Sequence, residues 1–165
     1  MAKSEVLRQE RSRRIRAQVS PEWTRFAQLW IAFNAIYGGE QDARERARIK
    51  AAIRKSISEG TARGLLARTD VAIGRILALP PGDMRRGQFD PDFRRATREQ
   101  ARLYRTSKRA LDRLVAVGGV LYQVRCNFVH GEKDPREARD QMLIRESVRV
   151  LEVLVPEMDR LRENG

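Results

Sequence analysis

The chain has 165 residues, a length typical of a single domain that buries one continuous core. A hydrophobic fraction of 41% and a charged fraction of 34% fit a globular protein and exclude a disordered or fibrous one. No apolar run is long enough to cross a bilayer, and the first residues lack the apolar stretch of a secretion signal. We therefore expect one cytoplasmic domain over residues 1–165, with no membrane association.

The formal net charge of +12 points toward a polyanionic partner such as a nucleic acid. Of the 34 cations, five are lysine and 29 are arginine, a bias that the codon composition of a genome can also produce. The charge is uneven along the chain, since residues 1–131 carry +14 and residues 132–165 carry −2. The basic character thus lies upstream of the last expected helix.

One cysteine and one histidine limit the chemistry of the chain. A lone Cys126 excludes an intramolecular disulfide, and together with the lone His130 it excludes a zinc site built from several Cys and His ligands. We expect no metal and no cofactor. Cys126 reads as a small buried hydrophobe rather than a nucleophile, because no third group completes a Cys–His hydrolase.

The first half of the chain predicts helices throughout. Residues 1–19 form a charged N-terminal helix, and Ser20-Pro21-Glu22 starts a second helix that ends at Gly38-Gly39. Five aromatic residues at helical spacing mark its face as core, although such a stripe can also stack bases; they are Trp23, Phe26, Trp30, Phe33 and Tyr37.

Two further helices are expected before the middle of the chain. Residues 41–58 form a charged helix that Gly60 and Gly64 break. Thr69-Asp70 then caps a short helix through Leu77, which Pro80-Pro81-Gly82 ends.

The second half begins with an irregular loop over residues 83–92. A long helix then runs from about Phe93 or Ser107 to His130, and Gly118-Gly119 within it permits a close helix contact. Asp134-Pro135 starts the last helix, which Pro156 can kink. The expected fold class is therefore all-α, a bundle of about five helices.

Arg125 is informative because it continues an apolar line through Leu111, Val115, Gly118 and Tyr122. An unpaired guanidinium on a buried face is costly, so Arg125 needs a carboxylate partner, a helix end or an incoming phosphate. An ion pair that only holds helices together remains the alternative to a functional role.

His130 stands at the expected end of the same helix, directly before Gly131. An imidazole at this position can interact with the helix dipole, and it is also the natural general acid or base near neutral pH. Five residues of regular helix turn a side chain by about 140°, so Arg125 and His130 do not converge on one phosphate. Either the backbone unwinds around residues 129–131, or two subunits form the site together. Gln123, Asn127 and His130 share a face, which makes Asn127 a supporting residue.

Two segments carry a family resemblance. Residues 125–131 read Arg-Cys-Asn-Phe-Val-His-Gly and resemble the Arg-x(4–6)-His signature of the HEPN superfamily. Residues 29–38, which include Trp30, Phe33, Asn34 and Tyr37, are similar to the Trp-x-x-Phe-Asn-x-x-Tyr segment of prokaryotic HEPN groups. The two segments occur in the expected order, about ninety residues apart.

The resemblance implies a metal-independent endoribonuclease that forms homodimers through the motif helix. By this resemblance His130 assists the attack of the ribose 2′-hydroxyl or protonates the leaving oxygen, and Arg125 stabilises the phosphate. Asn127, Asn34 and Tyr37 would support the site. Defence, toxin–antitoxin systems and RNA processing are the implied settings, with an antitoxin or defence-system protein as a possible partner.

Two alternatives to a nuclease stay open. The chain can be a non-catalytic HEPN module that binds RNA, a nucleotide or a protein, or an unrelated basic helical nucleic-acid binder. Further cations can line an RNA path or form a solvated face; they are Arg94, Arg95, Arg98, Arg102, Arg105 and Lys133.

Overall fold

The computed structural model describes residues 20–38, 45–130 and 137–163, and these residues form six α-helices and no strand. This confirms the all-α class. The helices are α2 (Pro21–Tyr37), α3 (Glu45–Ser56), α4 (Glu59–Ala78), α5 (Arg95–Thr106), α6 (Ala110–Val129) and α7 (Ala138–Glu163). The expected N-terminal helix and the start at Asp134-Pro135 lie outside the described residues.

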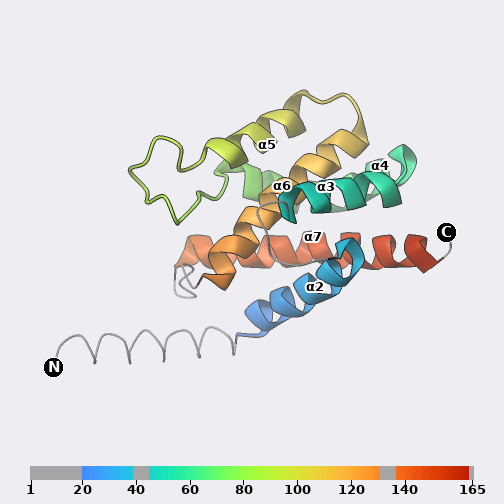
Figure 1. Ribbon diagram of the computed structural model, residues 1–165, viewed down its shortest axis with the longest axis horizontal. Helices are drawn as coiled ribbons and strands as arrows, with labels where there is room; N and C mark the ends of the chain where they lie inside the picture. The colour runs from blue at the N-terminus through green and yellow to red at the C-terminus, as the bar shows by residue number, and fades with distance from the viewer. Residues whose placement is uncertain (1–19, 39–44, 131–136, 164–165) are drawn as a thin grey trace.

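Helix α6 is the centre of the molecule (Figure 1). Helices α3, α4 and α5 pack against it, while α2 and α4 pack against α7. Fifteen of the twenty residues of α6 are buried, which explains why its sequence is apolar on almost every side. The polar side chains within its second half therefore lie in the interior of the protein.

The aromatic stripe of α2 is core, as its spacing predicted. Trp23 and Phe26 pack against Phe128 of α6, with ring centroids 5.3 and 5.0 Å apart. Because every ring of the stripe is buried, none of them is available to stack a base. The contact with Phe128 fixes the end of α6 against α2.

The predicted break at Gly60 and Gly64 is wrong. Both glycines lie inside α4, whose N-terminus is capped by Ser58 accepting a hydrogen bond from Thr61 N–H at 3.1 Å. The predicted helix start at Thr69-Asp70 is also wrong, because the Thr69 hydroxyl donates to the Leu65 carbonyl within the same helix. The sequence predicted only a short helix from Thr69-Asp70 to Leu77, and burial of one apolar face extends this helix back to Glu59.

The chain between α5 and α6 turns at Ser107. Of the two predicted starts of the helix that ends at His130, Ser107 is therefore nearer than Phe93 to the observed start at Ala110. The Glu59 carboxylate of α4 caps α6 by accepting hydrogen bonds from Ala110 N–H (2.7 Å) and Leu111 N–H (3.0 Å). These backbone bonds lower the pKa of Glu59, so the cap stays charged at the positive end of the helix.

Gly118 and Gly119 permit close helix contacts, as predicted. A Cβ at Gly118 would meet Ile53 Cδ1 of α3 at 2.6 Å, and one at Gly119 would meet Gln100 Oε1 of α5 at 2.9 Å. The two glycines therefore determine how near α3 and α5 approach α6.

We predict opposite effects for alanine at two helical glycines. Gly64→Ala, where nothing lies within 4 Å of the new Cβ, should raise the free energy of unfolding by roughly 0.5–1 kcal/mol through helix propensity. Gly118→Ala should lower it by about 1–2 kcal/mol, because the fully buried Ile53 must move. Urea unfolding followed by circular dichroism measures both, and equal stabilisation by the two variants would contradict the close contact.

A buried carboxylate joins α4 to α7. Glu146 of α7 is fully buried, and Arg75 of α4 donates to it at 3.0 Å while Arg149 does so from the next turn of α7. Burial opposes ionisation of Glu146, but the hydrogen bonds from the arginines outweigh it and lower its pKa. The charged form is thus the one that stabilises the fold.

The lowered pKa of Glu146 predicts an acid-sensitive fold. Its stabilisation is present above the unfolded pKa of about 4.3 and is lost as the pH falls through the lower folded value. Glu146→Gln should cost about 1–3 kcal/mol at pH 7 and should flatten the loss of stability below pH 5. Urea unfolding from pH 3 to 7 tests this, and an unchanged pH profile in the variant would exclude Glu146 as the cause.

Candidate functional site

The candidate site lies along the second half of α6 and at its C-terminal end. Arg125 is inside the protein, with 9% of its side chain exposed. Its Nη1 donates to Glu45 Oε2 at 3.3 Å, and Glu45 is 2% exposed. Glu45 is the first residue of α3, so of the three partners considered for Arg125 the structure shows the carboxylate.

Tyr37 belongs to the same buried group. Its hydroxyl donates to Glu45 Oε1 at 2.6 Å, so one carboxylate joins the end of α2, the start of α3 and the end of α6. Burial and the bond to Glu45 raise the pKa of Tyr37 above its usual range, which keeps the phenol a donor. The sequence singled out Tyr37 and Arg125, but it did not reveal Glu45, which is one of several acids in a charged segment.

His130 is separate from this group. It is exposed, it follows the last residue of α6, and its N–H still donates to the Cys126 carbonyl at 3.1 Å. The backbone therefore stays in helical register up to His130. Of the two arrangements considered, unwinding before His130 is absent, and in one protomer the buried Arg125 and the exposed His130 diverge around α6.

Asn127 is buried and its amide is turned toward the loop before α5. It donates to the Gly82 carbonyl at 2.8 Å and accepts from Gln123 Nε2 at 3.0 Å. Gln123 in turn accepts from Arg46 Nη2 of α3 at 3.0 Å. Asn127 thus positions the 82–94 segment against α6, whereas Asn34, on α2, is partly exposed.

Cys126 is buried, as expected of a small hydrophobe. Burial, and then the neighbouring Cys126, raise the pKa of Tyr122 to about 12. Among the described residues no group of three or more His, Cys, Asp or Glu side chains is placed to hold a metal ion.

The expected RNA-path cations lie in different surroundings. Arg95 and Arg102 are exposed beside Asp92 and Glu99, Arg98 is exposed on α5, and Arg105 donates to the Leu77 carbonyl at 2.9 Å. Arg94 lies over the Phe93 ring at 5.2 Å, and Lys133 is outside the described residues. Only Arg95 of this set lines the cavity described next.

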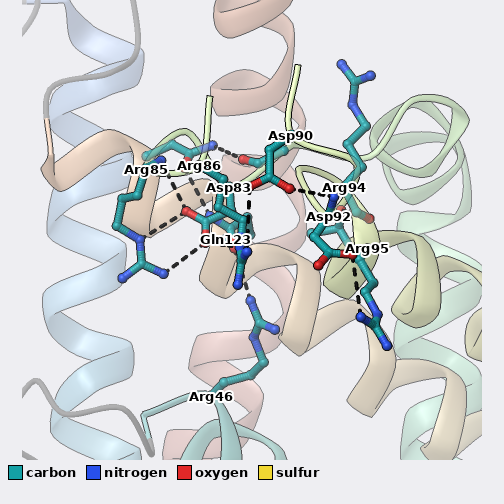
Figure 2. Close-up of polar contacts among 12 residues, drawn as sticks. Arg46, Asp83, Arg85, Arg86, Asp90, Asp92, Arg94, Arg95 and Gln123 are labelled. Carbon is teal, nitrogen blue, oxygen red and sulfur yellow. Dashed lines mark hydrogen bonds and ion pairs between the residues drawn. The ribbon is translucent and has the colours of Figure 1, made fainter. Parts of the chain in front are cut away.

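A cavity of about 530 Å³ opens between α3, α5, α6 and the 82–94 segment. Four arginines line it, Arg46 from α3, Arg85 and Arg86 from the segment, and Arg95 from α5. Figure 2 shows Arg46 reaching Gln123 while Arg85 and Arg95 pair with Asp83 and Asp92. The sequence indicated an irregular loop here, but it did not indicate Arg46, which comes from α3.

Comparison of the chain with protein-family models, with curated proteins and with solved structures found no match. No helix in the described ranges combines the length and apolarity that crossing a membrane requires.

The buried Arg125–Glu45 pair predicts that removing the cation alone destabilises the protein more than removing both charges. Arg125→Met should lower the free energy of unfolding by about 3–5 kcal/mol, because it leaves the Glu45 charge buried without its cation. Adding Glu45→Gln should restore part of that loss, since Tyr37 can still donate to the amide oxygen. Urea unfolding of the two singles and the double variant measures the coupling.

The matched control is the exposed pair Arg102–Glu99, with both side chains about half exposed. Arg102→Met should cost less than about 1 kcal/mol. A similar cost for Arg125→Met and Arg102→Met would contradict the buried pair.

Proposed function

We propose that the chain is a metal-independent endoribonuclease of the HEPN type that acts as a homodimer. The observation that carries the proposal is the exposed His130 at the end of a buried helix, five residues after the charged Arg125. The Arg-x(4)-His spacing and the Trp30, Phe33, Asn34 and Tyr37 segment of α2 support it through their resemblance to HEPN proteins.

The proposed chemistry needs two proton transfers. The ribose 2′-hydroxyl loses its proton and attacks the adjacent phosphorus, and the bond to the 5′-oxygen breaks as that oxygen takes up a proton. The products are a 2′,3′-cyclic phosphate and a 5′-hydroxyl. A dimer holds two exposed His130 side chains, so one can accept the first proton while the other donates the second.

Arg125 is the group proposed to stabilise the charge that develops on the phosphate. Glu45 and Tyr37 hold it at the inner end of the site, so these two are positioning residues. Since Arg125 and His130 diverge around α6, the arginine of one subunit serves beside the histidine of the other. Val129, which is 49% exposed next to His130, supplies apolar surface for that dimer contact.

A second candidate function is a non-catalytic RNA-binding module. The observation that favours it is the low exposure of Arg125 together with its existing partner Glu45, which suffices as a structural role. In this case the net charge of +12 accounts for RNA binding, and His130 has no part in a reaction.

A cleavage assay in excess EDTA tests the first function. Purified protein should cut total and transfer RNA and leave 2′,3′-cyclic phosphate ends, whereas His130→Ala should lower the rate by about 10²-fold or more. Arg125→Lys should retain part of the activity, because the charge remains. Arg63→Ala removes an exposed cation of α4 and serves as a control, and its rate should equal that of the native chain.

The alternatives give different results in the same assay. Equal cleavage by the native protein and His130→Ala would exclude the proposed site. No cleavage by native protein that nevertheless binds RNA would favour the binding module. A strict monomer by native mass spectrometry, with full activity, would exclude the two-subunit arrangement.

A further inference from the structure

The arginine-lined cavity between α3, α5, α6 and the 82–94 segment is held open by polar contacts. The Asn127 amide donates to the Gly82 carbonyl, and the Thr97 hydroxyl donates to the Pro81 carbonyl at 2.7 Å. Asp83 N–H closes the base of the segment by donating to the Phe93 carbonyl at 2.6 Å. The walls are therefore formed before any ligand arrives, which lowers the entropy cost of binding.

The cavity presents guanidinium groups that have donors to spare. Arg46 donates one N–H to Gln123, and its guanidinium lies over the Tyr122 ring at 5.1 Å. Its buried Nε has no hydrogen-bond partner among the described residues. Arg85 is oriented by Asp83, whose pKa it holds below the usual range. Each guanidinium carries five donors, so an arginine fixed by one carboxylate can still bind a phosphate.

Acidic side chains also line the cavity, and their neighbours decide the sign of its charge. Asp83, Asp92 and Glu99 are paired with arginines two or three residues away. Four arginines and three acids line the cavity, so its lining is net positive even with the acids ionised. Phosphate is thus the group that the cavity can attract.

The cavity is aligned with the proposed catalytic residue. Gln123 forms part of its floor, and His130 follows seven residues later, directly after the last residue of α6. Seven residues advance about 10 Å along an α-helix and return to nearly the same face. The cavity and the exposed imidazole therefore lie on the same side of α6, with the buried Asn127 and the Gly82 carbonyl that it binds between them.

Beyond the cavity the 82–94 segment carries an exposed aromatic ring. Phe89 is 92% exposed, and the loop that holds it extends away from the helices (Figure 1). It follows the cavity residue Arg86 by three positions, and Asp90, its neighbour, lies 3.7 Å from the Arg86 guanidinium. A cationic groove with an adjacent exposed ring is the combination that binds single-stranded nucleic acid, through backbone charge and base stacking.

We propose that this cavity binds the phosphates of single-stranded RNA a few nucleotides from the scissile bond, and that Phe89 stacks on an adjacent base. The inference identifies the substrate-binding part of the proposed nuclease. It rests on the proposed function only in assuming that the bound RNA is cut; binding itself does not depend on cleavage. The groups that contact RNA are Arg46, Arg85, Arg86, Arg95 and Phe89.

The test measures binding of a fluorescein-labelled 2′-O-methyl uridine dodecamer, which cannot be cleaved through its 2′-oxygen. Fluorescence anisotropy with the full chain in EDTA at 50–300 mM NaCl gives the affinity and its salt dependence. The double variant Arg86→Gln/Arg95→Gln should bind roughly tenfold more weakly. Its slope of log K against log salt should fall by about 1.4, the value for two lost phosphate contacts on a single strand.

The control double variant is Arg63→Gln/Arg160→Gln. Arg63 and Arg160 also pair with acids three or four residues away, and they are 77% and 58% exposed against 77% and 50% for Arg95 and Arg86. It removes the same charge outside the cavity, so its affinity should stay within about twofold of the native value. If both double variants weaken RNA binding equally, the cavity is not the binding site and the loss is a general effect of charge.

Phe89→Ala tests the stacking part. It should weaken binding of the uridine dodecamer roughly fivefold or more and leave binding of an abasic strand of equal length unchanged. Loss of a dimer in Phe89→Ala, with native affinity for RNA, would instead assign the ring to a protein contact and overturn its stacking role.

Cleavage kinetics separate this inference from the proposed function. The double variant Arg86→Gln/Arg95→Gln should raise KM with little change in kcat, whereas His130→Ala should lower kcat and leave dodecamer binding unchanged. If cleavage depends on His130 but the cavity variant binds RNA like the native protein, only the assignment of the cavity as the RNA-binding site is overturned. If binding depends on the cavity but the protein cuts no RNA, only the proposed nuclease function is overturned.

Discussion

The burial of α6 is the constraint on which the rest of the structure depends. A helix enclosed by four others cannot leave its polar side chains to water, so each must find a partner on an element that covers it. Arg125 finds Glu45 on α3, Gln123 finds Arg46 on the same helix, and Asn127 finds the Gly82 carbonyl. The positions of α3 and of the 82–94 segment are thus set by the polar residues of α6.

The same constraint shapes the candidate site. The first residue past the end of α6, His130, reaches solvent. Where α3, α5 and the 82–94 segment come together over Gln123, their side chains are too polar to close the gap, and the arginine-lined cavity remains. Both features are consequences of covering one apolar helix with highly charged neighbours.

The sequence predicted the apolar helices well because burial imposes a period on their residues. The aromatic face of α2 and the close contacts at Gly118 were both evident from spacing alone. The errors fell in α4, where Gly60 and Gly64 looked like breaks. Glycine costs a helix only about 1 kcal/mol, and the buried face of α4, with Leu65 and Ile73, outweighs that cost.

Only part of the candidate site could be predicted from the sequence, and the reason is different. Arg125 and His130 stood out because each is unusual in its local pattern, a cation on an apolar line and a lone imidazole at a helix end. Glu45 and Arg46 are ordinary members of a charged stretch, and nothing local separates them from Glu40 or Arg48. Their importance arises from a contact with α6 across about eighty residues of chain, which no spacing rule encodes.

The buried state of Arg125 also limits how a nuclease could be built here. An arginine that neutralises Glu45 offers little net charge to a phosphate in its own subunit, so the cations that first meet RNA must be elsewhere. The exposed arginines of the cavity meet this requirement, and they lie on the same side of α6 as His130. Binding and proton transfer would then use one face of the helix, whereas Arg125, on another face, would have to exchange its partner Glu45 for a phosphate to act in the reaction. In the proposed dimer two subunits would together span the 140° that separates the two residues on one helix, so one protomer alone would lack a complete site.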